Sequence, residues 1–230
     1  MKKILVIHAH PEKKSFNSSL KNCAVEHFKK QGSEVKVSDL YAMGFNPVGG
    51  PHDFIALSNP DFFKYQMEQV NAFEKNLFAP EVKIEMEKLL WCDTLIFNFP
   101  LWWFGLPAIL KGWVDRVFAM GFCYGAGKGI YDNGIFSTSA KASVDKKDKT
   151  AFCIITTGGP EMAYGKSGKN GDLENILYPI HHGMFYFVGM NVKAPFISFS
   201  PARITQEERV SELEKLEKFL EDLSSKKNLY

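Results

Sequence analysis

Apolar runs alternate with amphipathic segments along most of the chain. The first run, inside Lys3–His8, is continuously apolar, which is typical of a strand buried on both faces of a parallel sheet. Four similar runs predict further strands, and the segments between them predict helices. The expected strands are 3–8, 34–39, 94–99, 151–157 and 192–198, and the expected helices are 14–30, 63–73, 80–91, 107–118, 173–188 and 205–223.

Strands that alternate with helices indicate an α/β protein. The pattern predicts a flavodoxin-like, doubly wound, five-stranded parallel sheet with helices on both faces. The sequence has no repeat and no break in composition, so residues 1–230 are expected to form a single domain. Ligands bind such sheets at the carboxyl ends of the strands, so the loops that follow the strands are the candidate sites.

Charge and cysteine content narrow the functional classes. The 230 residues carry a formal net charge of +2, which provides no basic field for a nucleic acid. No apolar run approaches the roughly 20 residues of a membrane span, so no membrane insertion is expected. The first apolar run is too short for a signal peptide, and the four cysteines form no CxxC pair. Free thiols and a cytoplasmic location are therefore expected.

The loop after the first strand is rich in hydrogen-bond donors. His10, Ser15, Asn17 and Ser19 surround a predicted helix N-terminus, where backbone N–H groups favour phosphates. The loop has neither a Gly-x-Gly-x-x-Gly nor a Gly-Lys-Ser/Thr motif, which disfavours a Rossmann NAD site and a P-loop. Ordinary helix capping would explain the same residues.

The loop after the third strand carries three adjacent large rings. Trp102, Trp103 and Phe104 follow Pro100 and precede the helix that starts near Pro107. Such a wall favours a flat, aromatic ligand. The alternative is a hydrophobic loop that packs in the core or at a dimer interface.

The loop after the fourth strand combines small residues with donors. The glycines in Thr156-Thr157-Gly158-Gly159 let the backbone approach a ring edge, and Tyr164 follows shortly after. Their N–H and hydroxyl groups could stabilise a developing negative charge. A β-turn followed by a solvent-facing tyrosine would be the simpler explanation.

Together the three loops fit a flavin nucleotide better than nucleophilic catalysis. No Gly-x-Ser-x-Gly elbow or Cys/His pairing stands out. The spacing of the histidines also does not suit a metal site, since His8 and His10 are two residues apart and His181 and His182 are adjacent. We therefore expect no resident metal.

At these segments the chain resembles the FAD-dependent NAD(P)H:quinone oxidoreductases, the DT-diaphorase family. The matching runs are long and follow in order along nearly the whole chain. They are Ala9-His10, Ser15-Phe16-Asn17, Ser38–Met43 with Phe45-Asn46-Pro47, Phe99-Pro100-Leu101, Trp103-Phe104-Gly105, Pro107–Trp113, Ile155–Gly159 and Asn170-Gly171-Asp172.

The resemblance implies a homodimer that binds one FAD per subunit, with sites at the subunit interface. It implies a ping-pong cycle in which a reduced nicotinamide, NAD(P)H or a smaller dihydronicotinamide, gives hydride to flavin N5 and a quinone then accepts it. In such a cycle the protein orients the flavin and tunes its charge.

The resemblance also implies roles for individual residues. His10, Phe16, Asn17 and Ser19 would hold the pyrophosphate region, and Arg209 would reach the adenine end. The isoalloxazine would lie against Pro100, Leu101, Trp102, Trp103 and Phe104, with its pyrimidine edge at Thr156, Thr157, Gly158, Gly159 and Tyr164. The expected catalytic residues are Tyr164, Gly159 and Asn170, and the expected quinone pocket is Trp103, Phe104, Met162, Phe187 and Tyr124 from the partner subunit.

Departures from the family pattern point to its short form, the dihydronicotinamide riboside:quinone reductase. Asn170 stands where long-form members have a relay histidine, and the chain has the short form's length. Of the short form's metal ligands only His182 matches. Lys64 and Ala126 replace residues near the FAD and the pocket, so the quinone preference is expected to differ.

Two other functions remain open at this stage. The first is a flavodoxin-like electron carrier that binds FMN, although the usual carrier is acidic and lacks the aromatic wall. The second is a regulatory ancillary subunit of a potassium efflux system, although those proteins are shorter. Turnover with a reduced nicotinamide and a quinone would separate the enzyme from the carrier.

Overall fold

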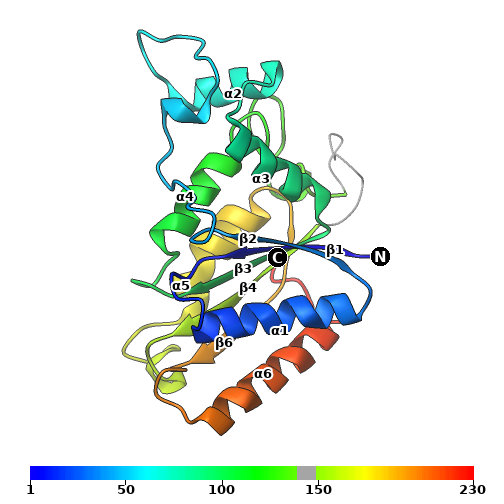
Figure 1. Ribbon diagram of the computed structural model, residues 1–230, viewed down its shortest axis with the longest axis vertical. Coiled ribbons are helices and arrows are strands. Elements are labelled where there is room, and N and C mark those ends of the chain that lie inside the picture. Colours follow the sequence, from blue (N-terminus) through cyan, green and yellow to red (C-terminus); the bar gives the residue numbers. More distant parts are fainter. Residues whose placement is uncertain (139–148) are drawn as a thin grey trace.

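The computed structural model describes residues 1–138 and 149–230 (Figure 1). A parallel sheet runs through its middle in the order β2-β1-β3-β4-β5, and β6 also pairs with β4. This order is the flavodoxin-like arrangement, as expected. The strands are β1 (Lys3–His8), β2 (Glu34–Asp39), β3 (Thr94–Pro100), β4 (Thr150–Thr157), β5 (Asn191–Val192) and β6 (Phe196–Phe199).

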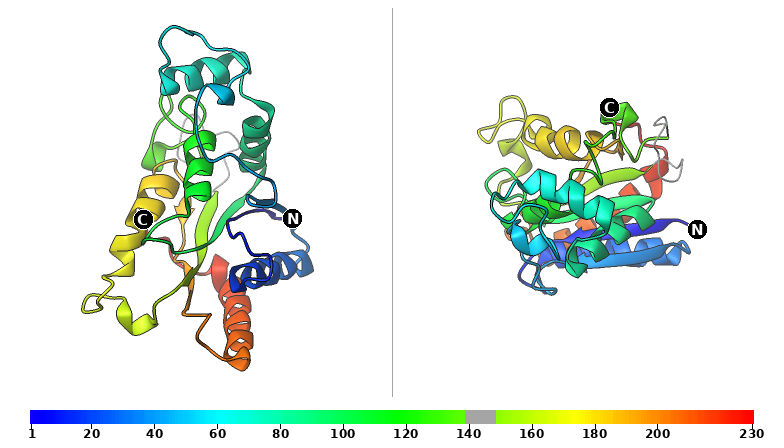
Figure 2. Two further views of the ribbon diagram at one scale, coloured as in Figure 1. Left: turned by 60° about the vertical axis from the view of Figure 1, so that its left-hand side comes forward. Right: turned by 90° about the horizontal axis from the view of Figure 1, so that it is seen from above.

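Helices cover both faces of the sheet (Figures 1 and 2). Two of them, α1 (Phe16–Lys30) and α6 (Gln206–Glu221), lie side by side on one face. The other face carries α3 (Pro80–Trp91), α4 (Ala108–Val117) and α5 (Leu173–Ile180), and α2 (Tyr65–Lys75) lies beyond them. None of the helices in the described ranges is long and apolar enough to cross a membrane.

The two faces explain why the first strand is continuously apolar. Successive side chains of a strand point to opposite faces. Ile4 and Val6 pack in the core under α1 and α6, whereas Leu5 and Ile7 pack in the core on the other face. Both cores exclude water, so no position in the middle of β1 is polar.

Two expected elements differ from the structure. The fifth strand, expected at residues 192–198, is divided into β5 and β6, and Pro195 lies in the gap, where it has no N–H to give to the ladder. The helix expected at 173–188 changes to a π-helix over His181–Tyr186, shortly after Pro179 removes one amide donor.

The long connection after β2 is held onto α4 by a buried arginine. Arg116 is fully buried, and its Nε donates to Asp53 Oδ1 at 2.7 Å, while Nη1 donates to the Asn46 carbonyl at 2.6 Å. Its Nη2 also pairs with Glu81, and the Tyr65 hydroxyl donates to Asp53 Oδ2 at 2.5 Å. These bonds, together with an isolated antiparallel bridge between Phe54 and Phe78, hold the connection in place.

Close approach of the same connection requires glycine at position 112. A Cβ there would lie 2.1 Å from the Pro47 carbonyl oxygen, and backbone cannot move aside as a side chain can. We expect Gly112→Ala to lower the free energy of unfolding by about 1–3 kcal/mol, despite alanine's better helix propensity. Urea denaturation would measure the change. Gly183→Ala, which meets no atom within 4 Å, is the control and should stay close to the parent protein.

Candidate flavin site

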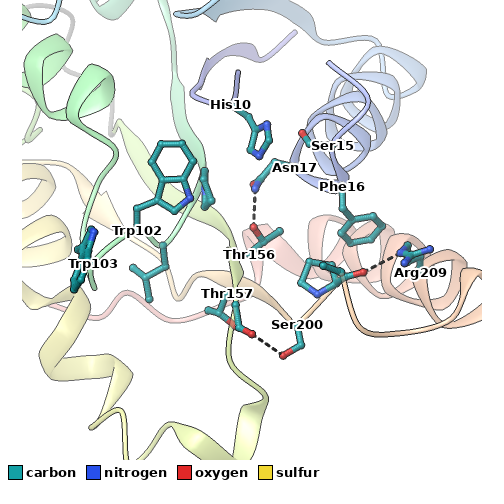
Figure 3. Close-up of a pocket in the computed structure, with 15 residues that line it drawn as sticks. His10, Ser15, Phe16, Asn17, Trp102, Trp103, Thr156, Thr157, Ser200 and Arg209 are labelled. Atoms are coloured by element: carbon teal, nitrogen blue, oxygen red, sulfur yellow. Dashed lines mark hydrogen bonds between the residues drawn. The ribbon is translucent and has the colours of Figure 1, made fainter. Parts of the chain in front are cut away.

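A cavity of about 570 Å³ lies at the carboxyl ends of the strands (Figure 3). It is formed by the loops after β1, β3, β4 and β6 together with the first turns of α1 and α6, so it unites segments far apart in sequence. Its lining consists of His10, Ser15, Phe16, Asn17, Pro100, Leu101, Trp102, Trp103, Thr156, Thr157, Gly158, Ser200, Pro201, Ala202 and Arg209.

One end of the cavity is made by the start of α1. Ser15 is the N-cap, and its Oγ accepts from the Ser18 amide at 3.1 Å. Asn17 is buried, and its Nδ2 donates to Thr156 Oγ1 at 2.6 Å. Asn17 Oδ1 has no hydrogen-bond partner among the described residues, which is costly for a buried acceptor. A ligand hydroxyl or N–H beside it would supply the missing donor.

The other end is made by the aromatic loop after β3. Trp103 and Phe104 have φ of 49° and 58°, a left-handed conformation that bulky residues rarely adopt. The Gly105 amide donates to the Trp102 carbonyl at 3.0 Å, so the loop is a tight turn with positive φ at both central positions. The turn leaves the Trp103 side chain 97% exposed. Strain of this kind often marks a functional site.

The loop after β4 brings the three expected catalytic residues together beside the cavity. A Cβ on Gly159 would lie 2.9 Å from Asn170 Nδ2 and 3.4 Å from the Tyr164 hydroxyl. The Thr157 hydroxyl donates to the Gly159 carbonyl at 2.8 Å, and Tyr164 packs on Phe199 with ring centroids 5.8 Å apart. The absence of a side chain at Gly159 therefore leaves room for the Asn170 amide and the Tyr164 hydroxyl.

A second cavity of about 350 Å³ adjoins the first between α1 and α6. Phe16 and Arg209 line both cavities. Arg209 Nε donates to the Pro201 carbonyl at 2.9 Å, which holds its guanidinium between them. Ser19, expected at the pyrophosphate, lines this second cavity rather than the first.

The expected quinone-pocket residues are not gathered in one place. Tyr124 and Phe187 pack edge to face, with centroids 5.7 Å apart, in a separate cavity of about 270 Å³ between α4 and the π-helix. Trp103 lies at the main cavity, and Met162 is 86% exposed. Within one chain these residues do not enclose a pocket.

Sequence reasoning missed three lining residues, Ser200, Pro201 and Ala202. They directly follow β6, and the Ser200 hydroxyl donates to the Gly158 carbonyl at 3.2 Å. The rule that placed the other loops, that ligands bind beyond the carboxyl ends of strands, would have found them if it had been applied to the last strand.

The cysteines provide no nucleophile. All four thiols are free, and burial raises the pKa of Cys23 and of Cys92 to about 11 and shifts those of Cys123 and Cys153 in the same direction. Such thiols remain protonated and unreactive. The part of the chain that the structure describes has no group of three or more His, Cys, Asp or Glu that could hold a metal ion.

Comparison with known proteins agrees with this geometry. A family model described as a flavodoxin-like fold matches residues 2–220. The ribosyldihydronicotinamide dehydrogenase [quinone] of Rattus norvegicus is 45% identical over 209 residues, which cover 90% of this chain and 86% of that protein. The chain belongs to the quinone oxidoreductase family with a flavodoxin-like fold. It is therefore an oxidoreductase.

Two further members extend the match. The NAD(P)H dehydrogenase [quinone] 1 of Cavia porcellus is 39% identical over 231 residues, covering all of this chain and 80% of that protein. The crystal structure of a Klebsiella pneumoniae protein assigned as a quinone reductase superposes with a TM-score of 0.89, at 36% identity, over 100% of this chain and 87% of the other. Both findings confirm the family resemblance of the sequence.

Proposed function

We propose that this chain is an FAD-dependent quinone reductase. A reduced nicotinamide would deliver hydride in one half-reaction, and a quinone would receive it in a second, ping-pong half-reaction. One observation carries the proposal: a single cavity joins the donor-rich start of α1 to an aromatic loop and to the donors after β4. That order matches the phosphate, ring and ring edge of a flavin nucleotide.

The second cavity favours FAD over FMN. FMN ends at its phosphate, whereas FAD continues into an adenosine. The space between α1 and α6 begins where the phosphate end of the first cavity stops, and Arg209 lies between the two. The pyrophosphate would lie by Phe16, and the adenine would extend past the Arg209 guanidinium, which can stack on a planar ring.

The fit rests on groups that the protein leaves available. Asn17 Oδ1 is a buried acceptor with no partner in the described ranges, and ribityl hydroxyls are donors of the required kind. When bound, FAD would supply the hydride chemistry itself. The protein would orient the ring against Trp102 and Trp103 and would stabilise negative charge with the Gly159 N–H and the Tyr164 hydroxyl.

We also propose that the quinone pocket is completed by a second copy of the chain. Trp103 and Met162 are almost fully exposed, which is unusual for large apolar side chains. Tyr124 and Phe187 lie in a different cavity of the same chain. A homodimer that brings Tyr124 of the second copy to the aromatic loop would account for both features.

The test is the absorbance spectrum of the purified protein, with the released cofactor identified by mass. We expect bound FAD that bleaches when NADPH or dihydronicotinamide riboside is added without oxygen, and recovers when menadione follows. Fast bleaching with only the riboside would assign the smaller donor. Bound FMN with no turnover would favour an electron carrier, and failure to bind any flavin after reconstitution would reject the proposal.

The tyrosine beside Gly159 provides a sharper check. Tyr164→Phe removes one donor to a developing negative charge, a loss of about 1–2 kcal/mol, so we expect flavin reduction to slow about tenfold. Stopped-flow absorbance measures the rate. Tyr178→Phe, an exposed tyrosine on α5, is the control and should reduce at the parent rate. An unchanged rate in Tyr164→Phe would exclude this role.

A further inference from the structure

A buried histidine lies directly beneath the phosphate end of the cavity. His8 is the last residue of β1 and is 1% exposed. Its Nδ1 lies 2.5 Å from Asn98 Oδ1 on β3, and its Nε2 lies 3.2 Å from Ser18 Oγ on α1. The histidine therefore connects the sheet to the helix whose N-terminus forms the cavity wall.

The hydrogen bonds of Asn98 determine which nitrogen of His8 carries the proton. Asn98 Nδ2 donates to the Ile154 carbonyl at 3.3 Å, which turns Oδ1, an acceptor only, toward the imidazole. Nδ1 of His8 must then be the donor. In the neutral ring Nε2 is left as an acceptor, and it can take a hydrogen bond from the Ser18 hydroxyl.

Ser18 has a single hydroxyl proton and three neighbours that compete for it. Its Oγ lies 3.2 Å from His8 Nε2, 3.2 Å from the Glu12 carbonyl and 3.1 Å from Ser15 Oγ. When His8 is neutral, Ser18 donates to it, and the oxygen of Ser18 is free to accept from Ser15. The Ser15 hydroxyl is then directed away from the cavity.

Protonation of His8 reverses the direction of the hydrogen bond between His8 and Ser18. The imidazolium donates to Ser18 Oγ, and the Ser18 proton turns to the Glu12 carbonyl. Ser18 then has less capacity to accept from Ser15, which releases the hydroxyl of that cap residue. Since Ser15 lines the cavity, its proton becomes available to an anion there.

We propose that His8 is a positioning residue for the phosphates of the bound dinucleotide, and that it takes up a proton when they bind. The inference rests on the proposed function, because the anion is the pyrophosphate of FAD. It adds to that function a charged group which acts through Ser18 and Ser15 and does not touch the ligand.

The surrounding charges set the direction of the effect. Burial lowers the pKa of His8 below its usual value. The hydrogen bond to Asn98 and the carboxylate of Asp39 on β2 oppose this, whereas the neighbouring Lys21 and His10 add to it. A bound pyrophosphate dianion raises the pKa. FAD affinity should therefore be constant at high pH and increase as the pH falls through the window between the bound and the free pKa.

The experiment compares FAD with riboflavin, which has no phosphate. In the parent protein we expect the FAD dissociation constant to fall several-fold from about pH 8 to about pH 6, and the riboflavin constant to stay unchanged. His8→Phe should weaken FAD binding near pH 6 by the same several-fold factor, with little effect near pH 8. Ser18→Ala removes the hydroxyl between His8 and Ser15 and is a smaller change, so it is the second test if His8→Phe does not fold. It should weaken the binding of FAD and leave the binding of riboflavin unchanged.

Controls separate this inference from other causes. His27→Gln alters another buried histidine, which lies on α1 and bonds to Gln31 rather than to the cavity wall, and this variant should bind FAD like the parent. His10→Gln removes the histidine that lines the cavity. A pH profile that is lost in His10→Gln but retained in His8→Phe would overturn the inference. A parent protein that binds no FAD would instead reject the proposed function.

Discussion

Arg116→Leu is expected to lower the free energy of unfolding by about 3–5 kcal/mol. The substitution removes the guanidinium that pairs with the buried Asp53 carboxylate, and it frees the Asn46 carbonyl. The Asp53 carboxylate and the Asn46 carbonyl both lie where the connection after β2 crosses α4. Without the guanidinium, the loss of their hydration is no longer compensated, and this contact should weaken. Urea denaturation of the parent and the variant under one set of conditions would measure the loss.

The same helix provides a matched control. Lys111 and Asp115 form an exposed pair, with Nζ and Oδ1 2.6 Å apart, four residues apart on α4. An exposed pair contributes at most about 0.5 kcal/mol, so Lys111→Leu should change stability little. Similar losses in the two variants would mean that burial does not determine the strength of the Arg116 contact.

The second large effect concerns the aromatic turn. Replacing Trp103 and Phe104 with Asn-Gly should raise the free energy of unfolding by about 1–2 kcal/mol, because Asn and Gly suit positive φ. Quinone turnover should fall more than about tenfold, since the wall for the flat ligand is lost. A gain in stability with a loss of turnover is informative, because a variant that folds poorly would lose both stability and turnover. Steady-state kinetics and urea denaturation measure the two.

A glycine placed at another left-handed position tests the stability part alone. Asn76, the C-cap of α2, has φ of 57° and lies outside the lining of the main cavity. Asn76→Gly should change stability by a few tenths of a kcal/mol and leave turnover unchanged. If the Asn-Gly turn retained full turnover, the aromatic loop would not be the wall of the active site.

Local sequence patterns predicted most of the elements. The bounds of β1 and β2 agree with the expectation, because each is a short run that contrasts with its polar neighbours. The helices that became α2 and α3 were also placed within two residues. These elements depend on side-chain periodicity and on nearby Pro or Gly, which are readable from one segment at a time.

The features that sequence reasoning missed depend on distant segments. Arg116 would read as a solvent-facing residue of an amphipathic helix, yet its carboxylate partner Asp53 lies 63 residues earlier. The division between β5 and β6 and the role of Ser200 likewise depend on how the chain passes β4. No local pattern contains that information.

The main cavity has a consequence for synthesis of the protein. Its lining extends from His10 to Arg209, where Ser200 directly follows β6 and Arg209 lies on α6. While Arg209 is still inside the ribosome, the emerged part of the chain contains only some of the residues that line the main cavity. Parallel sheets with distant pairings also fold slowly. The flavin would therefore stabilise the chain only after nearly all of it has emerged. When flavin is scarce, newly made protein should accumulate after synthesis is complete, as full-length chain without cofactor.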